Sequence, residues 1–218
     1  MLLTGWQKLL TMKVPFSSTR WKSRITLKES VLTPYEMQVA YCLGQLQSDL
    51  ALPILTSVLA DAEGQEPIVR HEAAEALAAI GGEEALEWVK KYQEDPSQEV
   101  RETCQLALAK LNLRQEENDG NVEGNVWGSH DPAPPSKEKD VKKLRQMLLD
   151  EDVPLFDRYR AMFSLRNIGD DESILALAAG LQCSSALFRH EIAFVLGQVS
   201  ILDVKDPREK SPLICTSP

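Results

Sequence analysis

Five copies of one helical pattern recur along the chain, and this internal repeat limits its fold more than any other feature of the sequence. When the copies are aligned on their apolar residues, the positions equivalent to His71 fall at residues 37, 71, 102, 159 and 190, so the steps are 34, 31, 57 and 31 residues. Steps of this size are typical of helix-turn-helix repeats, whose apolar faces are buried only when neighbouring repeats stack. The repeat predicts an all-α fold, an α-solenoid of stacked helix pairs.

An amphipathic segment adjoins most copies and can serve as the partner helix of each pair. Apolar side chains recur in these segments at three- and four-residue spacing, as in a helix that buries one face. The segments are residues 52–59, 84–92, 141–149 and 174–181. Residues that favour helix ends and turns lie between them, at Gly81-Gly82, Asp95-Pro96 and Gly169-Asp170-Asp171. The sequence therefore predicts helices over residues 35–112 and 139–199.

The single long step contains an interruption of the repeat. Residues 113–138 are polar and rich in Asn, Glu, Gly and Pro, a composition that favours a flexible linker. The linker divides the solenoid into an N-terminal half, residues 35–112, and a C-terminal half, residues 139–199. Residues 1–34 and 200–218 show no repeat. We expect both to be poorly ordered, a divergent leader and a divergent tail.

Charge and composition narrow the classes of function. The net charge of −9 argues against binding to nucleic acid through its phosphates. No segment approaches the ~20 apolar residues of a membrane-spanning helix, so we expect a soluble protein. Residues 1–28 carry six basic side chains and no acidic one, which weakly resembles a mitochondrial presequence. Since composition alone is a weak guide to targeting, we expect residence in the cytoplasm. The sequence does not indicate an oligomeric state.

The four cysteines, at positions 42, 104, 183 and 215, show no CxxC spacing, and no secretory leader precedes them. They are expected to be reduced and mostly buried thiols. The chain also contains no GxSxG motif, no glycine-rich phosphate loop and no HExxH zinc-protease motif. These observations argue against serine hydrolase, nucleotide-binding and zinc-protease chemistry.

Two of the three histidines occupy the same position of the repeat. His71 and His190 are each followed by a glutamate, Glu72 and Glu191, whereas His130 lies in the predicted linker and is expected to be incidental. One interpretation is a polar first turn in which glutamate complements the helix dipole. That interpretation does not explain the recurrence of histidine, a rare residue in this chain. Imidazole and carboxylate together suit iron, manganese or zinc, so the four residues are candidate metal ligands.

Helix geometry restricts the arrangement of these ligands. Adjacent residues on a helix point about 100° apart, so one pair binds an ion only with help from another helix. The two pairs lie on opposite sides of the linker, which predicts a site between the halves, on a concave face. Two histidines and two carboxylates suffice for one ion of the 2-His-1-carboxylate type.

Several segments together resemble deoxyhypusine hydroxylase. They are Arg70–Gly81, Arg101–Ala107, Asp131–Pro135, Arg158–Arg166, Ser185–Glu191 and Leu196–Gln198, and the similarity covers about residues 38–199. The resemblance implies a HEAT-repeat monooxygenase that hydroxylates deoxyhypusine, the modified lysine of one translation factor, with ferrous iron and dioxygen. It also implies four His-Glu pairs, two from each half, that hold two iron ions. His71-Glu72 matches the second pair and His190-Glu191 the third.

The chain departs from the family at the first and fourth pairs. Met37-Gln38 stands where the first pair is expected, and an unrelated tail follows where the fourth is expected. We therefore expect a variant with divergent termini, at most one weakly held iron ion and impaired hydroxylation. Two alternatives remain: a non-catalytic HEAT-repeat scaffold that binds a partner protein, and a chromophore lyase, because some of those enzymes use similar short helical repeats.

Overall fold

The computed structural model describes residues 29–117 and 127–204. It divides into two compact units, Met1–Tyr35 and Glu36–Pro218. Of the first unit, only residues 29–35 are described, and they form the beginning of helix α3, Glu29–Leu46. The site and the cores discussed below all lie in the second unit.

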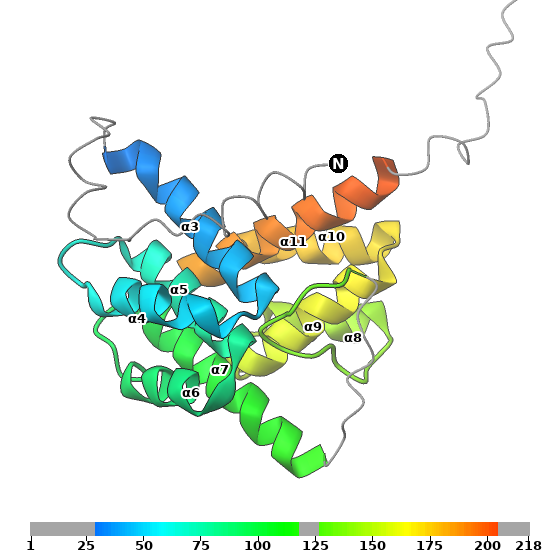
Figure 1. Cartoon of the computed structure of the whole chain (residues 1–218). Coiled ribbons are helices and arrows are strands. Elements are labelled where there is room, and N and C mark those ends of the chain that lie inside the picture. Colours follow the sequence, from blue (N-terminus) through cyan, green and yellow to red (C-terminus); the bar gives the residue numbers. More distant parts are fainter. Residues whose placement is uncertain (1–28, 118–126, 205–218) are drawn as a thin grey trace, which may run out of the picture. The chain divides into compact units, whose positions relative to one another are not determined.

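The described residues form helices joined by short connections and contain no strand (Figure 1). After α3 come α4 (Leu52–Ala60), α5 (Pro67–Ile80), α6 (Gly82–Lys91), α7 (Gln98–Glu117), α8 (Val141–Leu149), α9 (Leu155–Ile168), α10 (Asp171–Ala179) and α11 (Ala186–Val204). Short 3-10 turns, Asp49–Ala51 and Gly180–Gln182, precede α4 and α11. Every helix expected from the repeat is present, which confirms the all-α fold.

The helix ends follow the chemistry of the turn residues. Pro67 is the first residue of α5, where its missing N–H costs no hydrogen bond. Gly169 closes α9 with φ +70°, a left-handed conformation that favours glycine. The Asp170 side chain then accepts a hydrogen bond from the backbone N–H of Ser173 at the start of α10. The two helices of this pair can therefore meet through a very short connection.

In four of the five repeats, one arginine ties the helix to the connection before it. Arg70, Arg101, Arg158 and Arg189 all directly precede the position equivalent to His71. Arg70 donates to the carbonyl of Leu59 and Arg158 to that of Leu148, both in the last turn of the preceding helix. Arg101 and Arg189 donate to carbonyls in the preceding turns. Each guanidinium thus satisfies carbonyls that a helix end or turn leaves without a backbone partner.

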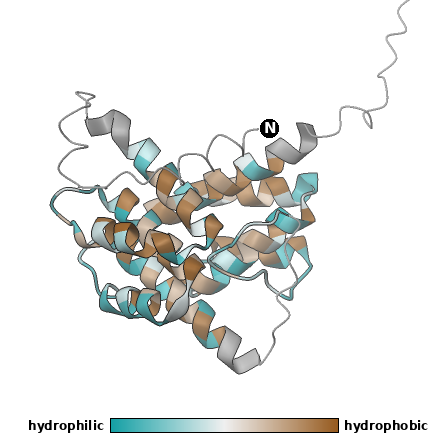
Figure 2. Ribbon diagram, viewed as in Figure 1, coloured by the Kyte–Doolittle hydropathy of each residue, from teal (hydrophilic) through white to brown (hydrophobic). Residues whose placement is uncertain are grey.

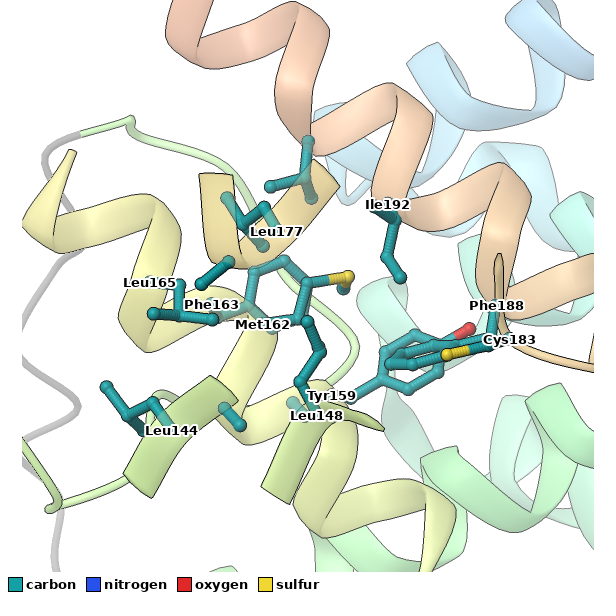
Figure 3. Packing of buried hydrophobic residues seen from close by; sticks show 14 of the residues in the cluster. Leu144, Leu148, Tyr159, Met162, Phe163, Leu165, Leu177, Cys183, Phe188 and Ile192 are labelled. Carbon is teal, nitrogen blue, oxygen red and sulfur yellow. The ribbon is translucent and has the colours of Figure 1, made fainter. Parts of the chain in front are cut away.

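Two hydrophobic clusters form the interior. The first is built on helices α3 to α7, and its most buried leucines are Leu55, Leu59 and Leu77. The second is built mainly on α8 to α11, around Tyr159, Met162 and Phe188, and also includes Leu106 of α7 (Figure 3). Apolar residues gather on the faces where the helices meet (Figure 2). Because the chain has few large aromatic residues, leucine and alanine fill most of this space.

The segment expected to be a flexible linker is structured in large part. Helix α7 continues to Glu117, five residues beyond the expected end at 112. Residues 127–138 are described, and Ala133 in this segment is fully buried in the second cluster. Its proline-rich composition indicated a lack of helix and could not show these tertiary contacts. Residues 118–126 lie outside the described part of the chain.

The described residues also bear on the expectations for membrane-spanning helices, for the cysteines and for the leader and tail. No helix in it is long and apolar enough to cross a membrane. Cys104 and Cys183 are buried free thiols, whereas Cys42 is exposed and Cys215 lies outside the described residues. The predicted tail begins within α11, which continues to Val204. The leader up to residue 28 and the tail from residue 205 lie outside the described residues.

Candidate metal site

His71 lies on α5 with its imidazole completely buried. Its Nδ1 is 3.0 Å from the Oγ1 of Thr103 on α7. The Thr103 hydroxyl donates its own hydrogen to the carbonyl of Glu99, at 2.8 Å, so it accepts from the imidazole. Nδ1 of His71 therefore carries the hydrogen, and the lone pair is on Nε2.

The Nε2 atom of His71 is buried and has no hydrogen-bond partner. Two carboxylate oxygens face it, Oε1 of Glu72 at 3.5 Å and Oε1 of Glu191 at 3.8 Å. A lone pair opposite ionised carboxylates cannot make a hydrogen bond, because all of these atoms are then acceptors. An unsatisfied acceptor in a buried place is costly, and a cation between these atoms would satisfy all of them.

His190 completes the group from α11. Its ring is 6.1 Å from the ring of His71, nearly perpendicular to it. His71, His190 and Glu191 each offer a ligand atom, and these atoms lie within 4.8 Å of one another. Two imidazoles and one carboxylate are the ligand set of non-haem ferrous sites. The residues present therefore fit an iron ion.

The structure brings together residues from both halves, as the spacing of the two pairs predicts. Glu72 contacts His71 but lies outside the group of three. His130 is exposed and is also outside that group. The assignment of the four candidate ligands stays a prediction.

Several carboxylates crowd this site and alter one another's protonation. Burial and the nearby Glu72 carboxylate raise the pKa of Glu75 to about 7. Burial, followed by the charges of Glu75 and Glu72, raises the pKa of Glu191 well above its ordinary value. Burial and the neighbouring His71 lower the pKa of His190, which favours the neutral imidazole that a metal requires. A bound cation would offset the repulsion among the carboxylates.

The pKa values of two neighbouring tyrosines are also raised. Burial, with the charge of Glu75, raises the pKa of Tyr41 to about 12. Burial, with the charge of Glu191, raises the pKa of Tyr159 well above its ordinary value. Both phenols therefore stay protonated at neutral pH.

Three residues near the site were not identified from the sequence. Glu75 lies four residues after His71, a spacing that places both on one side of a helix. Thr103 occupies the position in its repeat that Glu72 and Glu191 occupy in theirs. Lys110 lines a small cavity of about 10 Å³ together with Glu75 and His130, enough for about one water molecule. The helical spacing from His71 carried a signal for Glu75, whereas nothing in the sequence singled out Thr103 or Lys110.

The fold and the site define the class of protein. The chain is an all-α HEAT-repeat protein with a His-Glu cluster between two halves. A family of HEAT repeats matches residues 35–109, and a family of PBS lyase HEAT-like repeats matches residues 157–183.

The particular proteins that it resembles are deoxyhypusine hydroxylases. The chain is 56% identical to deoxyhypusine hydroxylase of Danio rerio over 186 residues, which cover 84% of this chain and 60% of the relative. It is 54% identical to the Homo sapiens protein over 82% of this chain and 58% of the relative. It is 52% identical to the Drosophila melanogaster protein over 78% of this chain and 56% of the relative. The resemblance expected from the sequence is confirmed.

A solved structure agrees with these relatives. Human deoxyhypusine hydroxylase in complex with glycerol superposes with a TM-score of 0.71 and 56% identity, over 75% of this chain and 56% of that one. The chain thus spans less than two thirds of the length of the curated relatives that it matches.

Proposed function

We propose that this chain is a deoxyhypusine hydroxylase that holds iron through His71, His190 and Glu191, with Glu72 at the edge of the site. The observation that carries the proposal is the unpaired, buried Nε2 of His71, which faces two carboxylate oxygens. The relatives, all named deoxyhypusine hydroxylase, support the same activity and do not favour a non-catalytic scaffold or a chromophore lyase.

Ferrous iron, when bound, supplies the reduction of dioxygen that hydroxylation of an unactivated carbon requires. The residues of the chain orient the ligands, supply negative charge and limit the access of water. Thr103 fixes the tautomer of His71, so that Nε2 is always available as a ligand. Glu191 offers a negative charge that a dication needs, and its exposed fraction is only 6%. Burial of this kind limits the access of water to the site.

The substrate is proposed to be a protein, the translation factor that carries deoxyhypusine. A side chain derived from lysine with free amines is cationic. The net charge of −9 favours its approach, and the crowded carboxylates of Glu72, Glu75 and Glu191 favour its arrival near the ion. Binding of the substrate can therefore persist when hydroxylation is weak.

We propose one iron ion per chain. Gln38 lies exposed on α3, where the family resemblance implies part of a first His-Glu pair. Among the described residues, the only group of three or more side chains that could hold a metal is His71, His190 and Glu191. Three protein ligands suffice for one iron ion, whereas two ions that shared them would each have too few ligands.

The test is to purify the chain without chelators, add ferrous iron without oxygen, and measure both bound iron and hydroxylation of deoxyhypusine. We expect up to one iron per chain and slow turnover. A chain that retains no iron would refute the proposed site. Two tightly bound irons and fast turnover would show that other residues complete a second site.

We also propose residence in the cytoplasm. The absence of a membrane-spanning helix among the described residues does not decide the compartment. A fluorescent fusion of the full chain should distribute through the cytoplasm, and its import into mitochondria would contradict the proposal.

A further inference from the structure

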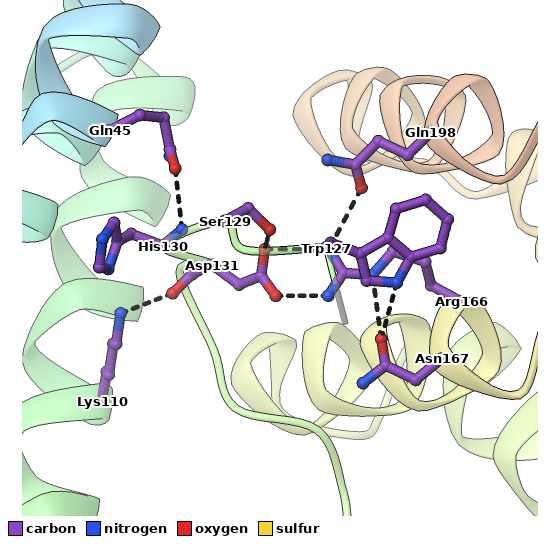
Figure 4. A network of polar contacts seen from close by, with 9 residues as sticks. All are labelled: Gln45, Lys110, Trp127, Ser129, His130, Asp131, Arg166, Asn167 and Gln198. Carbon is purple, nitrogen blue, oxygen red and sulfur yellow. Dashed lines mark hydrogen bonds and ion pairs between the residues drawn. The ribbon is translucent and has the colours of Figure 1, made fainter. Parts of the chain in front are cut away.

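A segment between the two halves, residues 127–136, is held firmly by the C-terminal half. We call it the strap. The carboxylate of Asp131 accepts two hydrogen bonds from Arg166 on α9, at 2.9 and 2.5 Å (Figure 4). The Arg166 side chain is completely buried, and that of Asp131 is 11% exposed. Such a bidentate pair, shielded from water, fixes both groups in one geometry.

Further contacts surround Arg166. Its guanidinium lies 5.4 Å from the ring centre of Trp127 in the strap and 4.7 Å from that of Phe163 on α9. It also donates to Oε1 of Gln198 on α11, at 3.2 Å. Arg166 thus joins the strap to the helix that carries His190 and Glu191.

The strap also contacts the N-terminal half. Lys110 on α7 donates to the backbone carbonyl of Asp131 at 2.5 Å. Gln45 on α3 accepts from the backbone N–H of His130 at 2.8 Å (Figure 4). One end of the same short segment is therefore bound to helices of both halves.

The relative position of the halves matters for the site. His71 comes from α5 in one half, and His190 and Glu191 come from α11 in the other. A metal site requires its ligands to be held within about 0.5 Å of the productive geometry. Direct side-chain contacts between the halves include the hydrogen bond from Ser185 to Glu102 at 3.1 Å and the edge-to-face pair of Tyr41 and Phe194.

We infer that the strap, with Asp131 as its central positioning residue, sets the distance between His71 and the ligands on α11. This inference rests on the proposed iron site. It assigns to residues 127–136 a role in metal affinity, although no strap side chain belongs to the group of three candidate ligands.

The experiment weakens the attachment of the strap to the N-terminal half alone. The double variant Gln45→Ala with Lys110→Met removes the hydrogen bonds that Gln45 and Lys110 make to the strap and leaves the buried pair of Arg166 and Asp131 intact. Gln45 is partly buried and Lys110 also keeps some exposure, so the variant should fold. The control is Gln105→Ala on α7, which loses a similar bond, to the carbonyl of Gln93, within one half.

Affinity for ferrous iron and for cobalt as a spectroscopic probe is measured on the full chain, together with the melting temperature without metal. We expect the double variant to lose about three- to thirtyfold in affinity at a temperature where it is fully folded. The control should bind as the unaltered chain does. Removal of the Lys110 charge by itself favours a bound cation but also favours protonation of Glu75. The comparison is therefore repeated in a Glu75→Gln background, where only the first effect remains and a lower affinity reports lost positioning.

The measurements distinguish failure of the proposed iron site from failure of the inference about the strap. An unaltered chain that binds neither metal overturns the iron site and this inference with it. If the unaltered chain binds metal and the double variant binds it equally well, only the inference is overturned. A lower melting temperature with unchanged affinity also overturns it, because the strap then stabilises the fold without positioning the ligands.

Discussion

The hydroxyl of Thr103 on α7 holds the imidazole of His71 on α5, with 3.0 Å between Oγ1 and Nδ1. Because the hydroxyl hydrogen is already donated to the carbonyl of Glu99, only one tautomer of His71 fits. The neighbouring repeat thereby directs Nε2 of His71 toward Glu191. Partners of this kind orient metal-bound histidines and raise metal affinity.

Replacement of Thr103 by valine should weaken metal binding. Valine has nearly the shape of threonine but cannot accept the Nδ1 hydrogen, so His71 loses its fixed tautomer and a buried hydrogen bond. We expect metal affinity to fall about 10- to 100-fold. Titration of the metal-free chain with ferrous iron or cobalt measures this change.

Thr103→Ser is the matched control, because it keeps the hydroxyl and should retain most of the affinity. Equal affinities of the valine and serine variants would show that the hydroxyl has no role in binding.

Loss of either histidine should remove the metal. His71→Ala and His190→Ala each delete one of two imidazole ligands, and the remaining carboxylates bind ferrous iron poorly on their own. His130→Ala is the control, because this exposed residue lies outside the group of ligands. Metal content after gel filtration distinguishes the three variants, and retention of iron by His71→Ala would place the site elsewhere.

The helices were predictable because the repeat carries its own signals. Apolar spacing, the turn residues near Gly81 and Gly169, and the recurrence of one pattern all agree, and local signals of this kind determine where helices begin and end. The two His-Glu pairs were found by the same alignment, since His71 and His190 share a repeat position.

The strap could not be predicted in the same way. Its pairing of Asp131 with Arg166 joins residues 35 positions apart, and nothing in either local sequence indicates the partner. The role of Thr103 was also hidden, because an isolated threonine in a helix has no distinct signal. Both features depend on how helices of different repeats pack, which a single sequence does not record.

The close approach of α3 and α5 depends on a glycine. A Cβ added at Gly44 would lie 2.7 Å from the Cα of Ala76, a backbone atom that cannot easily move. Gly44→Ala should therefore destabilise the fold by about 1–3 kcal/mol, as other overpacked substitutions do. Denaturant unfolding of the metal-free chain measures the change.

Gly197→Ala provides the comparison, since a Cβ at Gly197 would meet nothing within 4 Å. In an exposed helical position, alanine is favoured over glycine by about 0.5–1 kcal/mol, so this variant should be slightly more stable. A Gly44→Ala variant as stable as Gly197→Ala would mean that the two helices are not in close contact.

The partly buried carboxylate of Glu75 should make the metal-free chain less stable as pH rises. Burial and Glu72 raise the pKa of Glu75 from 4.5 to about 7, with Asp131 acting in the same direction and His71 and Lys110 opposing. The folded state therefore binds the proton more tightly than the unfolded state does. The protonated carboxyl of Glu75 therefore stabilises the folded state fully below pH 4.5, and this stabilisation is lost as the pH rises to about 7. Each unit by which the pKa is raised corresponds to about 1.4 kcal/mol in the free energy of unfolding.

Glu75→Gln tests this dependence, because glutamine resembles the protonated acid at every pH. At pH 5 the variant and the unaltered chain should melt at nearly the same temperature. At pH 8, without metal, the variant should be more stable, on the order of 1–3 kcal/mol, since it carries no buried charge. Glu87→Gln on the exposed side of α6 should change little at either pH. If Glu75→Gln shows the same difference at pH 5 and pH 8, the carboxyl of Glu75 does not titrate in this range, and the crowding of charge around His71 is weaker than the geometry indicates.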